Sequence, residues 1–311
     1  MKKVLLGNSG VEVSVFCLGA MYFGSRNDKR TSYHILDQYV EAGGSFIDTA
    51  NIYAFWVPGY IGGESETLLG EWMRERKNRH QLFIASKVGF AYQNVERGLK
   101  AHQIEEECNK SLKRLGIEAI DLYYAHVDDR NIPMEETMEA FDKLVKAGKV
   151  RLIGASNFLA WRLEEARWMN HSHGWAEYCC IQQRHTYIRP RAGTSFDPQV
   201  AANEDLLDYC RTRGVTMLAY SPLLSGAYNR SDRSFQEQYM SPDTDARLVA
   251  LKKVASELDA TVNQIVLAWM VHSDPCVIPL VAASMEEQMQ ENLEALEIKL
   301  SVEHMDYLNN A

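Results

Sequence analysis

The chain has 311 residues, of which 46% are hydrophobic and 24% are charged, and its formal net charge at pH 7 is −9. A chain of this length can bury a large core, and an acidic balance without basic clusters argues against nucleic acid as its main partner. Apolar runs are too short for a membrane span, and the N-terminal run is too short for a signal peptide. We therefore expect no membrane partner and a cytoplasmic location.

The six cysteines stand at positions 17, 108, 179, 180, 210 and 276, without the spacing of a metal site. Cysteines scattered in this way are typical of free thiols in a reducing compartment. We expect no metal site, and nothing in the sequence sets the oligomeric state.

The N-terminal segment predicts a β-hairpin, because the turn signal Asn8-Ser9-Gly10 separates two alternating stretches. Short apolar runs then alternate with amphipathic helical patterns. The expected strands are 15–20, 45–48, 82–86, 121–125, 150–155, 179–182, 215–219 and 277–281. The expected helices are 31–42, 64–76, 102–115, 134–147, 158–169, 203–213, 244–257 with 261–272, and 285–295. Two long loops, 53–63 and 224–243, interrupt the alternation.

Eight strand–helix units in one chain favour a closed α/β barrel, a (β/α)8 TIM barrel with an N-terminal β-hairpin, as a single domain over 1–311. The alternative is an open doubly wound sheet, which carries a GxGxxG turn after its first strand. Here the first expected strand leads into LGAMYFGS instead.

Four ionisable residues stand at or just beyond the ends of expected strands: Asp48, Tyr53, Lys87 and His126. In α/β barrels the loops that leave the strand ends converge on one face, where the chemistry is placed. An acid, a phenol, an amine and an imidazole on that face predict a site for proton transfer.

Lysine is rare in a buried strand unless it is paired, and Asp48 at the end of the preceding strand is a plausible partner for Lys87. An ion pair alone would be structural. Tyr53 changes the interpretation, because a nearby ammonium favours the phenolate and lowers the pKa of a tyrosine. His126 adds a donor that could orient or polarise a carbonyl oxygen.

In these segments the sequence resembles the aldo-keto reductase family, through the Asp-x-x-x-x-Tyr spacing, the SK strand end and LYYAH. The resemblance runs along nearly the whole chain. It implies a nicotinamide cofactor and hydride transfer to an aldehyde or ketone. It also implies that Tyr53 is the proton donor, that Lys87 and Asp48 tune its pKa, and that His126 orients the substrate.

Further segments carry the cofactor contacts that the resemblance implies. GASNF places Ser156 and Asn157 at a strand end, where their side chains can hydrogen-bond a carboxamide. Gln182 is the expected third contact, and Gln183 is the alternative if the register shifts by one. Tyr220 is expected to stack on the nicotinamide. The backbone through Ser221, Leu223, Ser225 and Gly226 would hold the pyrophosphate.

The segment after the last expected strand opens a helix, and helix N-termini bind anions. By resemblance, the 2′-phosphoribose and adenine contacts are Ala283, Ser284, Gln288, Glu291 and Asn292. Residues 279–292 contain neither Lys nor Arg, although the family often has a cation there. We therefore expect NADP(H) as the cofactor, with NAD(H) also possible.

The sequence predicts an NADP-dependent oxidoreductase that reduces a small-molecule carbonyl compound. Phe55, Trp56 and Tyr60 in the loop 53–63, with Asp128, Arg184 and His185, suit a sugar-like substrate about as well as an aromatic aldehyde. The alternative function is a nucleotide-binding regulatory subunit of the same superfamily, since such subunits can keep the four residues.

Overall fold

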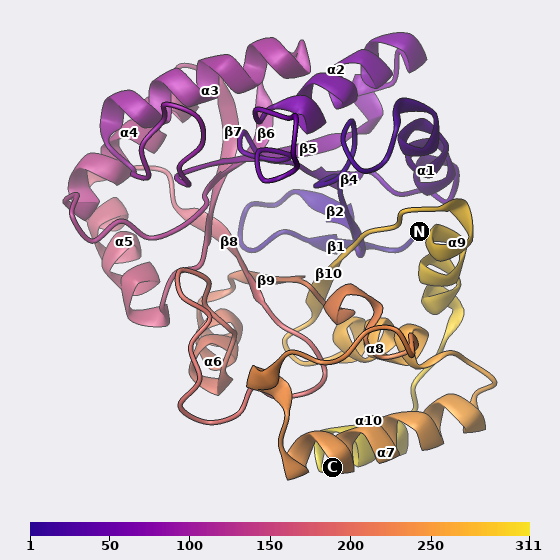
Figure 1. The fold of residues 1–311 in the computed structure, drawn as a ribbon. Helices are drawn as coiled ribbons and strands as arrows, with labels where there is room; N and C mark the ends of the chain where they lie inside the picture. The colour runs from indigo at the N-terminus through magenta and orange to yellow at the C-terminus, as the bar shows by residue number, and fades with distance from the viewer.

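The computed structural model describes residues 1–311, and its centre is a closed barrel of eight parallel strands (Figure 1). The strands follow one another around the barrel in chain order, and the last pairs with the first. They are β3 (Cys17–Gly19), β4 (Phe46–Asp48), β5 (Phe83–Val88), β6 (Ile120–Ala125), β7 (Val150–Ser156), β8 (Tyr178–Arg184), β9 (Thr216–Tyr220) and β10 (Val277–Val281). The expected barrel is confirmed.

Side chains alternate between the inside of the barrel and the helices around it, as the two-residue period of a strand requires. In β6, Leu122 and Tyr124 belong to the cluster inside the barrel, whereas Tyr123 and Ala125 pack into the larger core outside it. All four are fully buried. This burial on both faces explains the continuous apolar runs of the sequence.

Helices surround the barrel, and most of them agree with the expected ranges to within a few residues. They are α1 (Lys29–Glu41), α2 (Glu64–Arg76), α3 (Ala101–Leu115), α4 (Met134–Lys146), α5 (Ala160–His173), α6 (Glu204–Arg213), α7 (Pro242–Glu257), α8 (Val262–His272), α9 (Glu286–Glu294) and α10 (Val302–Asn309). Helices α7 and α10 lie side by side outside the ring (Figure 1). No helix is long and apolar enough to cross a membrane.

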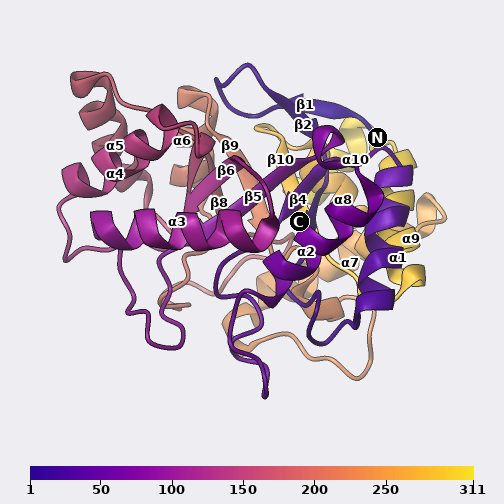
Figure 2. The same ribbon diagram turned by 90° about the horizontal axis from the view of Figure 1, so that it is seen from above.

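The hairpin β1 (Lys3–Leu5) and β2 (Glu12–Ser14) is antiparallel, as expected, and covers one end of the barrel. Leu6 and Val13 are fully buried in the cluster inside the barrel. The N–H of Gly7 donates to Thr216 Oγ1 over 2.6 Å. Figure 2 shows the hairpin at one end of the molecule and the long loops at the other.

Two of the shifted boundaries and one additional helix have clear physical reasons. The strand expected at 15–20 is shorter, because only its central residues form ladder pairs. Helix α7 starts at Pro242 rather than 244, since Ser241 caps it and proline suits the first helical position. Helix α10 was not expected, although Ser301 and His304 form a capping box at its start.

Candidate active site

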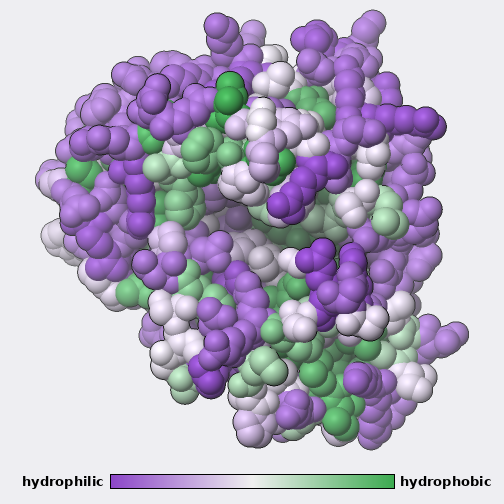
Figure 3. Space-filling view, viewed as in Figure 1, coloured by the Kyte–Doolittle hydropathy of each residue, from purple (hydrophilic) through white to green (hydrophobic).

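The residues expected at the strand ends meet at the barrel end opposite the hairpin. Asp48 is the last residue of β4, Lys87 lies near the end of β5, His126 directly follows β6 and Ser156 ends β7. Tyr53 lies on a turn just beyond β4. The molecular surface is hollowed at the centre of this face (Figure 3). The topology of the parallel barrel therefore brings residues far apart in sequence to one place.

Lys87 is the centre of a buried hydrogen-bonded group. Its ammonium forms an ion pair with Asp48 and donates to the carbonyl oxygen of Thr49 over 2.8 Å and to the hydroxyl oxygen of Tyr53 over 2.7 Å. Asp48 also accepts a hydrogen bond from Gln182 Nε2 over 2.8 Å. The side chains of Lys87 and Asp48 have no exposed surface. A charged pair that is buried this completely needs these additional hydrogen bonds to compensate for its lost hydration.

The tyrosine pKa departs from the expectation. Burial raises the pKa of Tyr53 well above its usual range, and the charge of Asp48 adds to this increase. The expected lowering by Lys87 is therefore wrong for the net shift, because loss of hydration outweighs the ammonium contact. At neutral pH Tyr53 is a protonated phenol, which is the form that can donate a proton.

His126 borders the same group. Its ring lies 6.1 Å from that of Tyr53 and 4.6 Å from that of Phe90, measured between centroids. Burial lowers the pKa of His126 well below its usual range, and the nearby Lys87 charge acts in the same direction. The imidazole is therefore neutral at pH 7, and its buried Nδ1 has no hydrogen-bond partner.

The three amide-binding residues expected at the strand ends have different surroundings. Asn157 is fully engaged: its Nδ2 donates to the His126 carbonyl over 2.9 Å, and its Oδ1 accepts from the Tyr220 hydroxyl over 2.8 Å. Ser156 Oγ accepts one hydrogen bond from Asn157 and donates to no group of the protein. The amide oxygen of Gln182 accepts no hydrogen bond. Ser156 and Gln182 are thus the better placed to meet a carboxamide.

The alternative Gln183 has a structural role in the fold. Its Oε1 accepts from the N–H of Asn157 over 2.6 Å, and its Nε2 donates to the Phe158 carbonyl over 2.8 Å. Because neighbouring side chains on a strand point to opposite faces, Gln183 faces away from the barrel interior that Gln182 enters. The alternation of β8 therefore favours Gln182.

The segment after β9 has an unusual backbone. Ser221, Leu224, Ser225 and Gly226 have φ of 56°, 46°, 59° and 86°. Left-handed conformations of this kind are uncommon for non-glycine residues and often mark ligand sites. Successive N–H groups in such turns form concave anion sites. The expected pyrophosphate segment, which includes Leu223, thus has a suitable backbone, and Tyr220 at its start is partly exposed.

The residues expected around the adenosine end are largely occupied by contacts within the protein. Gln288 Oε1 accepts from both the N–H and the hydroxyl of Ser284, over 2.8 and 2.9 Å. Asn292 donates to the Ala282 carbonyl over 3.1 Å, and the Ala283 carbonyl accepts from Asn27 over 2.9 Å.

Helix α9 is also less suited to an anion than expected. Its first turn carries Glu286 and Glu287, whose charges oppose an anion at the helix N-terminus. Glu291 accepts from Asn229 over 3.2 Å and thereby connects α9 to the loop 224–243. The same loop contains a cation, Arg230, whose side chain lies close to the turn at Gly226. A methyl group added to Gly226 would come within 3.0 Å of Arg230 Cδ.

Aromatic rings border the group formed by Tyr53, Lys87 and His126. The ring of Trp56 lies 6.0 Å from that of Tyr53, and 43% of Trp56 is exposed. Phe90 packs edge-on against His126. The sequence predicts a place near the pocket for Trp56 and Phe55 but not for Phe90, although Phe90 lies three residues after Lys87 at a strand end, which is a usable signal.

The other polar residues expected near the pocket are engaged elsewhere. Asp128 accepts from Arg162 through both carboxylate oxygens. Arg184 donates to Tyr239 over 3.0 Å, to Gln199 over 3.0 Å and to Gln236. These contacts attach the two loops beyond β8 and β9 to the barrel.

No group of three or more His, Cys, Asp or Glu side chains is arranged to hold a metal ion. The six cysteines are free thiols.

Comparison with known proteins agrees with the barrel fold. The model of the aldo/keto reductase family matches residues 15–311. An uncharacterised oxidoreductase, YrpG, of Bacillus subtilis is 29% identical over 100% of this chain and 95% of its own. A norsolorinic acid reductase of Emericella nidulans is 30% identical over 97% of this chain and 79% of its own.

Two further similarities bear on the chemistry. An aryl-alcohol dehydrogenase [NADP(+)] of Phanerodontia chrysosporium is 30% identical over 97% of this chain and 83% of its own. The crystal structure of the thermostable aldo-keto reductase Tm1743, solved with the inhibitor epalrestat, superimposes with a TM-score of 0.79 at 30% identity. It covers 100% of this chain and 99% of that one.

Proposed function

Because the chain belongs to the aldo/keto reductase family, we propose that it uses NADPH to reduce an aldehyde or ketone to an alcohol, with Tyr53 as the proton donor. Its relatives are oxidoreductases, which supports carbonyl reduction in general. The observation that carries the finer proposal is the contact of Tyr53 with Lys87, 2.7 Å long, inside a fully buried ion pair with Asp48.

Each residue of the group has a defined part in this proposal. Tyr53 holds a proton on its hydroxyl at neutral pH and gives it to the carbonyl oxygen of the substrate. Lys87 donates to the Tyr53 oxygen and so stabilises the charge that the phenol acquires when the proton leaves. Asp48 keeps Lys87 charged and in position. His126 is neutral and offers an N–H to the same carbonyl oxygen.

The cofactor would lie along the strand ends. When bound, NADPH supplies the hydride. Ser156 and Gln182 would bind its carboxamide, and the ring of Tyr220 would stack on the nicotinamide. The left-handed turn at Ser221–Gly226 would hold the pyrophosphate through N–H groups.

The preference between NADP(H) and NAD(H) is proposed to be modest. Ser284 offers a hydroxyl and an N–H to a 2′-phosphate, but Gln288 already accepts from both. Arg230, next to the Gly226 turn, could supply a positive charge, although it pairs with Asp232 over 2.6 Å. An exposed, shared cation favours a phosphate less than a free one.

For the substrate, the surroundings favour a flat aromatic carbonyl compound over a sugar-like one. Trp56 and Phe90 present apolar surfaces beside Tyr53 and His126. The polar residues that would recognise hydroxyl groups, Asp128 and Arg184, are already engaged with protein partners. Two relatives, named for norsolorinic acid and for aryl alcohols, agree with this choice.

The test is NADPH oxidation with benzaldehyde, and with glyceraldehyde as the sugar-like comparison, in the original protein and in Tyr53→Phe. We expect a higher kcat/KM for benzaldehyde. The variant should lose about 10²-fold or more in turnover, the usual effect of removing a general acid, and keep its NADPH affinity by fluorescence titration. Full turnover in the variant would refute the role of Tyr53. NADPH binding without turnover of either aldehyde would favour the regulatory-subunit alternative.

A further inference from the structure

The ring of helices is not continuous. Neighbouring helices pack against one another around most of the barrel, but α6 and α8 hardly touch. A cavity of about 650 Å³ lies between them, lined from the end of β8, the start of α6 and parts of α7, α8 and α10. None of the four catalytic residues lines it. A cavity of this volume is in the range that holds small ligands.

A buried cation faces this cavity with few partners. Arg247 of α7 is 3% exposed, and its one hydrogen bond runs from Nη1 to the Leu308 carbonyl over 3.3 Å. Its Nε is enclosed and makes no hydrogen bond, and the nearest Asp243 carboxylate oxygen is 3.7 Å away. The guanidinium stacks 4.6 Å from the centroid of the Tyr187 ring. A buried guanidinium whose carboxylate neighbour lies beyond hydrogen-bond distance favours an anion beside it.

The other cations of the cavity differ from Arg247. Arg184 is saturated by Tyr239, Gln199 and Gln236. Arg189 lies at the exposed rim, where it approaches Asp243 at 3.4 Å. Two carboxylates also line the cavity, Glu204 and Asp274, and both are exposed. Arg247 is thus the buried cation of this cavity that has the fewest hydrogen bonds.

Part of the wall is apolar and aromatic, and the rest is polar. The apolar part comes from Tyr187, Ile188, Leu207, Trp269 and Pro275. The ring of His185 stacks on Trp269 at 5.7 Å. Burial and the charge of Arg247 lower the pKa of His185 to about 4, so this ring is neutral at pH 7. An apolar patch beside the incompletely paired Arg247 would bind a molecule with an aromatic body and one negative group.

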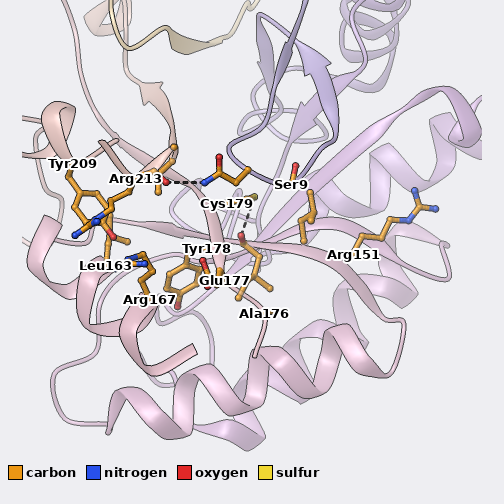
Figure 4. A pocket seen from close by; sticks show the side chains of 15 residues that line it. Ser9, Arg151, Leu163, Arg167, Ala176, Glu177, Tyr178, Cys179, Tyr209 and Arg213 are labelled. Carbon is orange, nitrogen blue, oxygen red and sulfur yellow. Dashed lines mark hydrogen bonds between the residues drawn. The ribbon is translucent and has the colours of Figure 1, made fainter. Parts of the chain in front are cut away.

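A second cavity also contains arginines, but each of them is paired with a carboxylate. It measures about 350 Å³ and lies beside the hairpin at the other end of the barrel (Figure 4). Its arginines are paired: Arg167 and Arg213 with Glu164 at 2.7 and 3.2 Å, and Arg151 with Asp121 at 3.0 Å. Both cavities therefore contain cations. The α6–α8 cavity differs from the cavity beside the hairpin because its Arg247 is incompletely paired.

We propose that the cavity between α6 and α8 is a binding site for a small aromatic carboxylate, whose carboxylate pairs with Arg247 and whose ring packs against the apolar side chains of Ile188, Leu207 and Pro275. None of the four catalytic residues lines this site, and its ligand is bound without reaction.

Calorimetric titration tests the site with 1-naphthoate and its uncharged analogue 1-naphthamide, on protein saturated with NADP⁺. We expect one naphthoate to bind, and naphthamide to bind at least about tenfold more weakly, since a hydrogen bond to a charged group contributes at least that factor. Arg247→Met should weaken naphthoate by a similar factor. Arg189→Met, the matched change at the rim, should have less than about threefold effect.

Two further variants keep the outcome decisive if Arg247→Met does not fold. Leu207→Trp should fill the cavity from α6 and abolish naphthoate binding while Arg247 remains. Tyr53→Phe, on the catalytic face, should leave naphthoate affinity unchanged. Equal affinity for the two probes, or a loss of naphthoate binding in Tyr53→Phe but not in Leu207→Trp, would overturn the proposal.

Discussion

The barrel has a buried carboxylate paired with a cation near each of its ends, and the two pairs differ in what surrounds them. Near the hairpin, Asp121 at the start of β6 pairs with Arg79 and Arg151 and accepts the N–H of Ile84 over 2.7 Å. At the opposite end, Asp48 pairs with Lys87. Both are acids in β-strands, and burial raises the pKa of both.

The difference lies in their neighbours. Around Asp121 the cations reach out to solvent: the side chain of Arg151 is 67% exposed. The Lys87 cation beside Asp48 is buried, and its ammonium donates a hydrogen bond to the Tyr53 hydroxyl. A buried ion pair by itself is therefore no sign of a functional site. A buried pair whose cation also contacts a titratable group at the open face is such a sign.

The largest expected difference between the two ends is in Lys87→Met compared with Arg151→Met. Lys87→Met should lower kcat by about 10²-fold, since the charge formed on Tyr53 loses its donor. Removing an ammonium from beside a phenol raises the phenol pKa, so the alkaline limb of the pH–rate profile should move to higher pH. Arg151→Met should change neither. A normal rate and profile in Lys87→Met would mean that Lys87 only neutralises Asp48.

The next change affects the hairpin end alone. Gly7 has φ of 55°, and a methyl group on it would overlap the Cys179 carbonyl oxygen. Gly7→Ala should therefore lower the free energy of unfolding by about 1–3 kcal/mol, as overpacking usually does. Gly10→Ala is the control, because φ there is 74° and no atom lies within 4 Å. Urea unfolding measures both, and equal losses would show that backbone strain rather than overlap is responsible.

Asp121→Asn should produce a smaller loss. It keeps the acceptor for Ile84 and removes the charge that faces Arg79 and Arg151, so we expect a loss of about 1–2 kcal/mol in unfolding free energy. The kcat of the folded protein should not change. A fall in kcat comparable to that of Lys87→Met would mean that the two ends are coupled and that the contrast between them fails.

The smallest expected effect concerns the proposed choice of cofactor at the barrel end that holds Asp48. Ser284→Arg should raise the preference for NADPH over NADH by about tenfold, because a guanidinium binds a phosphate through two hydrogen bonds. Stability should stay the same. Fluorescence titration of both cofactors measures the ratio. If the original protein already prefers NADH strongly, the 2′-phosphate is not recognised in this region.

Much of the fold could be predicted from the sequence because the barrel strands are buried on both faces. The run 277–281 and the helix 64–76 were predicted with the bounds that the structure has. Helix α10 was missed, because its pattern is short and its only strong signal is the capping box at Ser301. Strand β3 was overextended, since apolar residues beside a strand look the same as those within it.

The site was predicted in part for the same reason. Asp48, Tyr53 and Lys87 were brought together correctly because strand ends converge. The net pKa shift of Tyr53 was not predictable, because it depends on a degree of burial that no local pattern encodes. Nor did the sequence indicate that Asn157 would be engaged by Tyr220 and His126, since those contacts join three separate strand ends.

The closure of the barrel has a consequence for how the protein is made. Cys17 pairs with Leu280, and Gly7 of the hairpin bonds to Thr216. The first strand therefore has no partner on one side until almost the whole chain has been synthesised, which takes on the order of tens of seconds at ribosomal rates. During that time an apolar strand edge is open to other chains. We expect newly made protein to depend on chaperones more than the stability of the finished barrel would suggest.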